Sequence, residues 1–261
     1  MNDLINNSGK TLIETLCAKI KNAAYCTVLT GAGVSTLSGI RDFRGKNGLY
    51  KEMDAEKIFD ISYFKNDPSF YYKAAGSFIY NIDEKEPSIV HNVLGGLEKA
   101  GIVKALITQN IDLLHQKGGS VRVIEIHGSP QIHYCMNNCA GVSMTFAEAA
   151  AIVKAGDFPR CPKCKRILKP AITFFGEQLP EKALREAAEE ARKSDLMLIL
   201  GTSLQVFPAA SIPDYCLEAG GQIIIVNNMP THLDSKAVLH FDDLEEVFEG
   251  IKKYFQGENE L

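Results

Sequence analysis

Residues 25–36 read YCTVLTGAGVST, a short apolar and β-branched run that ends in a glycine turn. Because the run has no polar face, it predicts a strand from a sheet that is covered on both sides. The turn Gly31-Ala32-Gly33 predicts a strand-to-helix junction, where the backbone can approach a bound phosphate. Position 36 is Thr, whereas the dehydrogenase fingerprint has a third glycine or alanine there. Taken alone, the turn is explained equally well by a tight turn that binds nothing.

The strand pattern recurs along the chain, at residues 103–108, 121–126, 196–200 and 222–226. Helical patterns lie between several of these runs. Residues 11–22 are amphipathic, and residues 180–193 place acidic side chains early and basic ones late, as the helix dipole favours. This alternation predicts an α/β fold, a Rossmann-like doubly wound parallel sheet.

Two segments interrupt the alternation. Residues 46–94 contain many aromatic side chains at helical spacing, and residues 131–169 contain four of the seven cysteines. We expect these segments to be a helical insertion and a zinc-binding insertion that pack together as a small lobe. The Rossmann-like domain would then comprise about residues 1–45, 95–130 and 170–261. Both parts would form one unit, residues 1–261.

The composition excludes several classes of protein. A chain of 261 residues that is 46% hydrophobic can bury a sizeable core. Its net charge of −4 argues against direct binding of nucleic acid, which favours a basic face. No apolar run has the length of a membrane span, so no membrane partner is expected. The first residues lack a signal-peptide pattern, and seven cysteines then predict a reducing, cytoplasmic location without disulfides.

Four cysteines form two close pairs, Cys135/Cys139 and Cys161/Cys164. Pairs at this spacing predict a tetrahedral zinc site, and four thiolates leave no open position for catalysis. The zinc ion is therefore expected to be structural. Two alternatives stay open at this point, four free thiols or a site in which His133 replaces one cysteine.

His127 follows a strand-like run, in the sequence Glu125-Ile126-His127-Gly128. A histidine suits general base catalysis at pH 7, because its ordinary pKa of about 6.5 leaves it largely neutral. A lone histidine is more often a structural residue, so this interpretation depends on the surrounding motif. His115 is interpreted as a packing residue.

In order and content, the motifs resemble those of the sirtuins, the NAD-dependent protein lysine deacylases. The resemblance rests on blocks spread from Thr30 to Asn227. These blocks are Gly31-Ala32-Gly33-Val34-Ser35, Asp42-Phe43-Arg44-Gly45, Thr108-Gln109-Asn110-Ile111-Asp112, Leu114-His115, Glu125-Ile126-His127-Gly128, the four cysteines, Phe174-Phe175-Gly176-Glu177, Gly201-Thr202-Ser203-Leu204 and Val226-Asn227. The chain departs from the family at Arg41, where sirtuins usually have proline, and in the Cys-x-x-x-Cys spacing of its first pair.

The resemblance implies roles for individual residues. His127 would be the general base, with Asn110 as a second catalytic residue. The residues implied to contact NAD are Gly31, Ala32, Gly33, Thr36, Phe43, Arg44, Gln109, Asn110, Ile111, Asp112, His127, Gly201, Thr202, Ser203 and Asn227. Those implied to contact the substrate are Phe43, Thr173, Phe175, Gly176 and Glu177.

The implied activity is removal of an acyl group from a protein lysine, with release of nicotinamide and O-acetyl-ADP-ribose. The substrate would be a protein or peptide docked as an added strand. Sirtuins that remove acidic acyl groups have a tyrosine and an arginine in the helical insertion. Here no arginine lies between Arg44 and Arg122, and Ala75 and Phe78 fit the corresponding positions. Acetyl is therefore the expected group.

Several alternatives remain. A long-chain deacylase, an ADP-ribosyltransferase or an NAD hydrolase could use the same scaffold. A non-catalytic NAD sensor is disfavoured, since His127 and Asn110 are both retained. A dehydrogenase is disfavoured by Thr36 and by the cysteine insertion.

Overall fold

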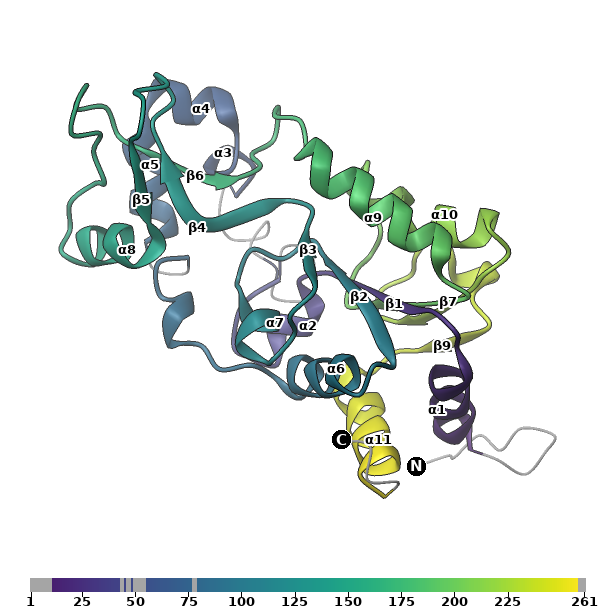
Figure 1. Cartoon of the computed structure of the whole chain (residues 1–261). Helices are drawn as coiled ribbons and strands as arrows, with labels where there is room; N and C mark the ends of the chain where they lie inside the picture. Colours follow the sequence, from purple (N-terminus) through teal and green to yellow (C-terminus); the bar gives the residue numbers. More distant parts are fainter. Residues whose placement is uncertain (1–10, 43–44, 46–47, 49–54, 77–78, 258–261) are drawn as a thin grey trace.

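The computed structural model describes residues 11–42, 45, 48, 55–76 and 79–257. Its centre is a six-stranded parallel sheet with the order β3-β2-β1-β7-β8-β9 (Figure 1). The strands are β1 (Cys26–Thr30), β2 (Val103–Thr108), β3 (Val123–Glu125), β7 (Leu196–Leu200), β8 (Gln222–Val226) and β9 (Leu239–Phe241). The sheet confirms the predicted doubly wound α/β class.

Two details of the sheet differ from the sequence prediction. Strand β3 is shorter than the predicted run 121–126, because the backbone N–H groups of Val121 and Arg122 donate to the Glu98 carboxylate at 3.0 and 2.6 Å. Their N–H groups are therefore not used for strand pairing, although the Arg122 carbonyl accepts from Leu106 N of β2 at 3.1 Å. The edge strand β9 was not predicted, since three residues with His240 in the middle give no strand pattern.

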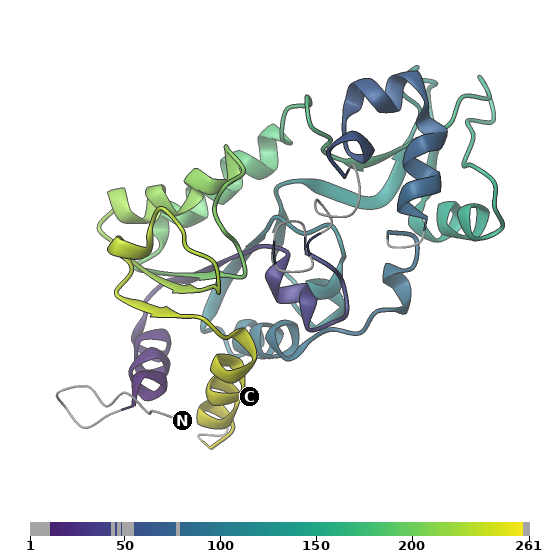
Figure 2. The same cartoon turned by 180° about the vertical axis from the view of Figure 1, so that it is seen from behind.

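Helices cover both faces of the sheet (Figures 1 and 2). One face packs against α1 (Leu12–Asn22), α6 (Ile89–Lys99) and α11 (Leu244–Gly257), and the other against α9 (Glu181–Lys193) and α10 (Ile212–Glu218). The central strands β1 and β7 are buried at every position, which explains why their sequences show no polar alternation. Among the described helices, none is long and apolar enough to cross a bilayer.

The short elements complete the sheet unit. They are α2 (Gly33–Thr36), α7 (Leu114–Lys117), and the 3₁₀ turns η3 (Ala209–Ser211) and η4 (Asp234–Lys236). Helix α6 packs against β2 and α11, with Val90, Val93, Leu94 and Leu97 in the sheet core. By these contacts α6 belongs to the sheet unit, although residues 89–94 fall in the range 46–94 that we assigned to the helical insertion.

A second, smaller core lies beside the carboxyl ends of the strands. It contains α3 (Ala55–Ile58), α4 (Ile61–Asn66), α5 (Pro68–Ala75), η2 (Ile82–Glu84) and α8 (Phe146–Lys154), with a three-stranded antiparallel sheet of β5 (Ser143–Thr145), β4 (Gly128–Tyr134) and β6 (Lys169–Ile172). Aromatic side chains from both segments share this core, with Tyr71 and Tyr72 from the helical segment and Phe146 and Phe158 from the cysteine-bearing segment. The helical and the cysteine-bearing segments thus pack against each other, and we call them the small lobe.

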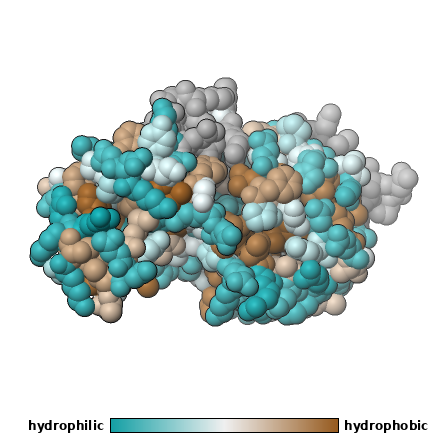
Figure 3. All heavy atoms as spheres, turned by 90° about the horizontal axis from the view of Figure 1, so that it is seen from above, coloured by the Kyte–Doolittle hydropathy of each residue, from teal (hydrophilic) through white to brown (hydrophobic). Residues whose placement is uncertain are grey.

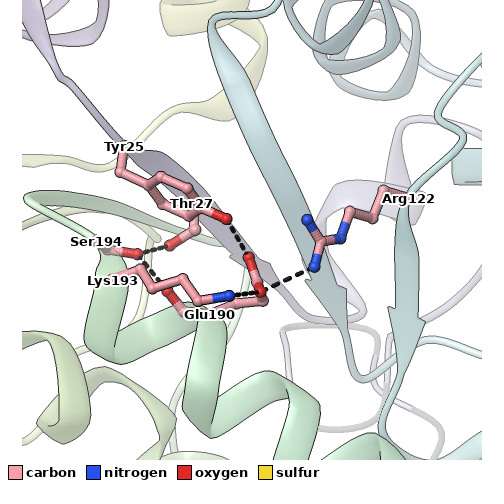
Figure 4. Close-up of polar contacts among 6 residues, drawn as sticks. All are labelled: Tyr25, Thr27, Arg122, Glu190, Lys193 and Ser194. Carbon is pink, nitrogen blue, oxygen red and sulfur yellow. Dashed lines mark hydrogen bonds and ion pairs between the residues drawn. The ribbon is translucent and has the colours of Figure 1, made fainter.

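At the amino ends of the strands, one buried carboxylate ties α9 to the sheet. Glu190 accepts hydrogen bonds from Tyr25 Oη at 2.5 Å, Arg122 Nη2 at 2.8 Å and Lys193 Nζ at 2.6 Å (Figure 4). Beside it, the hydroxyls of Thr27 and Ser194 lie 2.5 Å apart. These contacts fix the end of α9 over the starts of β1 and β3.

Candidate functional site

A cavity of about 930 Å³ lies at the carboxyl ends of the parallel strands, between the sheet unit and the small lobe. The strand order reverses direction between β1 and β7, and open α/β sheets bind ligands at such a switch point. The volume is within the range of ligand pockets. Figure 3 shows the two masses side by side, with hydrophobic residues among polar ones where they meet.

The turn after β1 packs directly against the turn after β7. A Cβ atom at Gly31 would lie 2.7 Å from Cβ of Thr202, and one at Gly33 would lie 2.7 Å from Cα of Gly201. Contacts this short are not tolerated, so glycine is required for the two turns to meet. The glycines thus have a packing reason in addition to the predicted approach to a phosphate.

Every described residue that we predicted to contact cofactor or substrate lines this one cavity. They are Gly31, Ala32, Gly33, Thr36, Gln109, Asn110, Ile111, Asp112, His127, Thr173, Phe175, Gly176, Glu177, Gly201, Thr202, Ser203 and Asn227. Phe43 and Arg44 lie outside the described residues. Arg41, the departure from the family pattern, is exposed and also lines the cavity.

Ser35 connects the polar residues on the cavity floor. Its hydroxyl donates to Asp112 Oδ2 at 2.6 Å and accepts from Asn110 Nδ2 at 3.2 Å. Asn110 Nδ2 also donates to the Gly31 carbonyl at 3.0 Å, which leaves its side-chain oxygen as the acceptor. Burial raises the pKa of Asp112, and the hydrogen bonds from Ser35 and from the Leu114 backbone oppose this. We did not single out Ser35 from the sequence, although it stood in the quoted motif.

The ring of His127 is held with its Nδ1 atom 2.8 Å from the Gln109 carbonyl oxygen. A carbonyl oxygen can only accept, so Nδ1 carries the hydrogen and Nε2 keeps its lone pair. Burial lowers the pKa of His127, and the bond to Gln109 partly opposes this. The ring is therefore neutral at pH 7, and Nε2 is its basic nitrogen.

Polar side chains that follow β2, β7 and β8 are also held by hydrogen bonds at the cavity, and one of these bonds joins the ends of β2 and β7 across β1. Gln109 Nε2 donates to Thr202 Oγ1 at 2.9 Å, and Thr202 Oγ1 also accepts from Leu204 N at 3.2 Å. Asn227 Nδ2 donates to the Met229 carbonyl at 2.6 Å. These bonds fix the groups that follow β2, β7 and β8 around the cavity.

The small lobe contributes an apolar wall. Phe59, Ile79, Ile82, Ile172 and Phe174 line the cavity on this side. The sequence did not single out these residues as site residues, because apolar side chains at helical spacing are usually core. Ala75 is fully buried, and Phe78 lies outside the described residues. An apolar wall favours uncharged ligand groups, since an unpaired buried charge is costly.

The four cysteines of the two pairs converge in the small lobe. The sulfur atoms of Cys135, Cys139, Cys161 and Cys164 all lie within 4.8 Å of one another, and Cys135 Sγ is 3.5 Å from Cys164 Sγ. Four sulfurs bonded to zinc at about 2.3 Å would be roughly 3.8 Å apart, so the group fits the ion after a small contraction.

The thiols in this group ionise unequally. A hydrogen bond from the Cys164 backbone lowers the pKa of Cys161 to about 6, whereas a bond to Cys164 together with burial raises the pKa of Cys139 to about 12. Four adjacent thiolates require a cation to balance them, and a divalent metal supplies that charge.

The remaining histidines have structural partners. His133 Nε2 lies 2.7 Å from Tyr80 Oη and is not part of the sulfur cluster, so the alternative of a histidine ligand is wrong. His115 is buried, with Nε2 2.9 Å from Thr30 Oγ1 and its ring centroid 4.6 Å from that of His91. This environment agrees with a packing role.

Comparison with known proteins gives one family. The sequence model of the Sir2 family matches residues 31–208. The chain is 42% identical over 222 residues to an NAD-dependent protein deacetylase of Thermotoga maritima, with 85% of this chain and 89% of that protein covered. It is 41% identical over 238 residues to NAD-dependent protein deacylase 2 of Archaeoglobus fulgidus, with 90% and 88% covered.

The fold is similar to solved structures of the same kind. A Sir2 protein in complex with a deacetylated p53 peptide and 3'-O-acetyl-ADP-ribose matches with a TM-score of 0.86 at 37% identity. The match covers 94% of this chain and 98% of the other.

Proposed function

The chain belongs to the Sir2 family, and we propose that its cavity removes acetyl groups from protein lysines with His127 as the general base. The protein is an NAD-dependent protein lysine deacylase with a structural zinc ion in its small lobe. The observation that carries the proposed role of His127 is its position in the cavity, with Nδ1 bonded to the Gln109 carbonyl at 2.8 Å.

The arrangement of His127 supports base catalysis. Because Nδ1 is committed to Gln109, the proton taken from a ribose hydroxyl would go to Nε2. The lowered pKa keeps the ring neutral and ready to accept at pH 7. The Nδ1–H bond then stabilises the ring after it is protonated, since a cationic donor makes a stronger hydrogen bond.

The polar floor supports binding of the nicotinamide and ribose portions of NAD. NAD, when bound, supplies the ribose carbon that accepts the acyl oxygen. The carboxylate of Asp112 and the side-chain oxygen of Asn110 can accept from an amide or hydroxyl, and both are fixed in place by Ser35. Thr202, Ser203 and Asn227 would bind the phosphate and adenosine side, because they follow β7 and β8.

The substrate is an acyl-lysine within a protein or peptide. The Sir2 structure with a deacetylated peptide supports a peptide as the substrate. We propose that the peptide docks as an added strand along Thr173, Phe175, Gly176 and Glu177, between the lobes. Seven cysteines, none of them in a disulfide, support action in a reducing compartment, the cytoplasm.

Acetyl is the proposed acyl group. The small-lobe wall is built from Phe59, Ile79, Ile82 and Ile172. Ala75 and Phe78 stand at the positions that we matched to the tyrosine and the arginine of acidic-acyl sirtuins, so neither position offers a cation. Succinyl and malonyl groups would therefore bury a carboxylate without a partner. A long neutral chain is the second candidate, because this wall is apolar.

The decisive experiment is mass spectrometry of an acetyl-lysine peptide incubated with the protein, with and without NAD. We expect NAD-dependent loss of acetyl and formation of O-acetyl-ADP-ribose, with activity lowered on the order of 10²–10⁴-fold in His127→Ala. A succinyl-lysine peptide is the matched control for the acyl group. Consumption of NAD with an unchanged peptide would contradict the proposal and indicate NAD hydrolysis or ADP-ribosyl transfer.

A further inference from the structure

Lys169, the first residue of β6, has an almost completely buried ammonium group beside the cavity. Its side chain is 1% exposed, and it is not among the residues that line the cavity. We propose that Lys169 is a positioning residue that fixes the substrate-binding wall, residues 172–177, from behind. This inference rests on the proposed function, which assigns peptide binding to that wall.

All three N–H groups of the Lys169 ammonium have an acceptor. Nζ donates to the Ile172 carbonyl at 2.7 Å and to the Pro170 carbonyl at 3.3 Å, and it pairs with Glu177 Oε2 at 2.9 Å. It also lies 4.1 Å from the ring centroid of Phe174, within the range of a cation–π contact. A buried charge is tolerated only when it is paired in this way.

These contacts begin and end the wall. Ile172 is its first residue and Glu177 its last, so one ammonium joins both ends of the segment. The Glu177 carboxylate also accepts from Phe174 N at 2.8 Å, and Glu177 N donates to the Phe174 carbonyl at 3.0 Å. Two hydrogen bonds between Phe174 and Glu177 thus close the turn formed by residues 174–177. Lys169 fixes the carboxylate that makes one of them.

The turn carries the groups that the peptide would meet. Phe175 is 41% exposed, and Gly176 has a φ of +87°, a conformation that side chains rarely adopt. Loss of the ammonium would leave the Ile172 carbonyl and the Glu177 carboxylate without their partner, and the turn would loosen. Shifts of about 1 Å in such a wall can cost roughly a hundredfold in activity.

His127 has separate support. Thr173 N donates to the His127 carbonyl at 2.7 Å, but the ring is oriented by Gln109. NAD contacts after β1, β7 and β8 are also independent of Lys169. We therefore expect loss of the ammonium to act on the KM for the peptide, with a smaller effect on kcat and on the KM for NAD.

The test uses Lys169→Met in the full zinc-loaded chain, since methionine keeps much of the length and loses the charge. We expect the KM for an acetyl-lysine peptide to rise roughly tenfold or more, while the KM for NAD stays within about twofold. Lys169→Arg, which keeps the charge and the donors, should restore a large part of the loss. Lys154→Met is the matched control, because Lys154 forms ion pairs with Asp83 and Glu84 on the surface of the same lobe.

Zinc content shows whether the small lobe is intact in each variant. If Lys169→Met does not fold, Glu177→Gln tests the same pair from its partly exposed side, with a rise of roughly two- to tenfold in the KM for the peptide. A peptide KM within about twofold of the wild type in the folded variant, or equal rises for peptide and NAD, would overturn the proposal. Peptide affinity measured by calorimetry separates this from the proposed function: a wild-type protein that binds the peptide without deacylating it contradicts only the latter.

Discussion

The carboxyl and amino ends of the parallel sheet both contain buried polar side chains, but those at the carboxyl end face a cavity. There Asn110, Asp112 and His127 each keep a lone pair for a ligand after their bonds to the protein are made. At the amino end, Glu190 is bonded to Tyr25, Arg122 and Lys193 (Figure 4). The polar groups at the amino end thus bond to one another and not to a ligand.

The pKa shifts follow the same division. Burial raises the pKa of Asp112 and lowers that of His127, so the carboxyl end holds groups displaced toward their neutral forms. Burial would also raise the pKa of Glu190, but the bonds from Lys193 and Tyr25 and the charge of Arg122 lower it overall. We therefore expect substitutions at the carboxyl end of the sheet to change activity. Substitutions at the amino end should change stability.

Zinc removal should have the largest effect, and only on the carboxyl end. In C161S/C164S we expect loss of the metal and a fall in deacylation of at least about a hundredfold, because structural zinc contributes on the order of 10 kcal/mol in small zinc peptides. The small lobe supplies one wall of the cavity, so its loosening removes the peptide site. Zinc analysis, activity and limited proteolysis measure this together.

Cys216→Ser is the control for this change, since Cys216 is a buried cysteine of the sheet unit outside the sulfur cluster. It should keep zinc and activity. The Glu190 cluster lies on the sheet unit, so the protease-resistant core of the zinc-free protein should retain it. Simultaneous unfolding of both lobes on zinc loss would contradict the separation of the two ends.

Glu190→Gln should have the second largest effect, with stability rather than activity changed. The glutamine is isosteric but neutral, so the bonds from Tyr25, Arg122 and Lys193 lose the carboxylate charge that strengthens them. This predicts a loss of about 2 kcal/mol in the free energy of unfolding. The loss is limited because Arg122 and Lys193 are 46% and 51% exposed and can return to water. Urea unfolding measures the change, and the KM values for NAD and peptide should stay the same.

Glu189→Gln is the matched control, one residue earlier on the exposed face of α9. It should leave the free energy of unfolding within about 0.5 kcal/mol of the wild type. A change in kcat or in the KM for NAD in Glu190→Gln would show that the amino end influences the active site and would break the comparison.

Much of the carboxyl end could be predicted from the sequence, because its chemistry is concentrated in short motifs at strand ends. The strands at residues 103–108, 196–200 and 222–226 were predicted with the bounds that the structure has. The glycine turn and each cysteine pair can be recognised within a few consecutive residues. For the same reason the described candidate residues all meet in one cavity.

The remaining features depend on contacts between distant residues, which no local pattern reveals. Lys169 meets Glu177 across a turn, and Glu190 meets residues more than 60 positions away in Tyr25 and Arg122. Each looks like an ordinary surface charge in the sequence. The apolar wall of Ile79 and Ile82 was missed because an aliphatic side chain is the same whether it faces a core or a cavity.

Mild acid should destabilise the carboxyl end first, through the buried pair His91 and His115, which contacts the end of β1 at Thr30. His91 accepts from Ser88 N at 3.0 Å, and its ring lies against that of His115 with the two planes tilted by 56°. Burial lowers the pKa of His91 to about 4. Because the unfolded histidine has a pKa of about 6.5, the unfolded state binds more protons between these values, and stability falls as the pH falls. For His91 the loss between pH 7 and pH 5.5 should be about 1 kcal/mol.

His91→Asn isolates this contribution, since asparagine keeps an acceptor for Ser88 N and does not titrate. We expect the variant to lose about 1 kcal/mol less than the wild type between pH 7 and pH 5.5, as measured by urea unfolding at each pH. Glu190, whose pKa is lowered, contributes stability above about pH 4.5 and loses it only below, so Glu190→Gln should keep the wild-type slope over the same interval. If the free energy of unfolding fell equally with pH in the wild type and in His91→Asn, His91 would be protonated alike in the folded and unfolded states. The two ends of the sheet would then not differ in their response to acid.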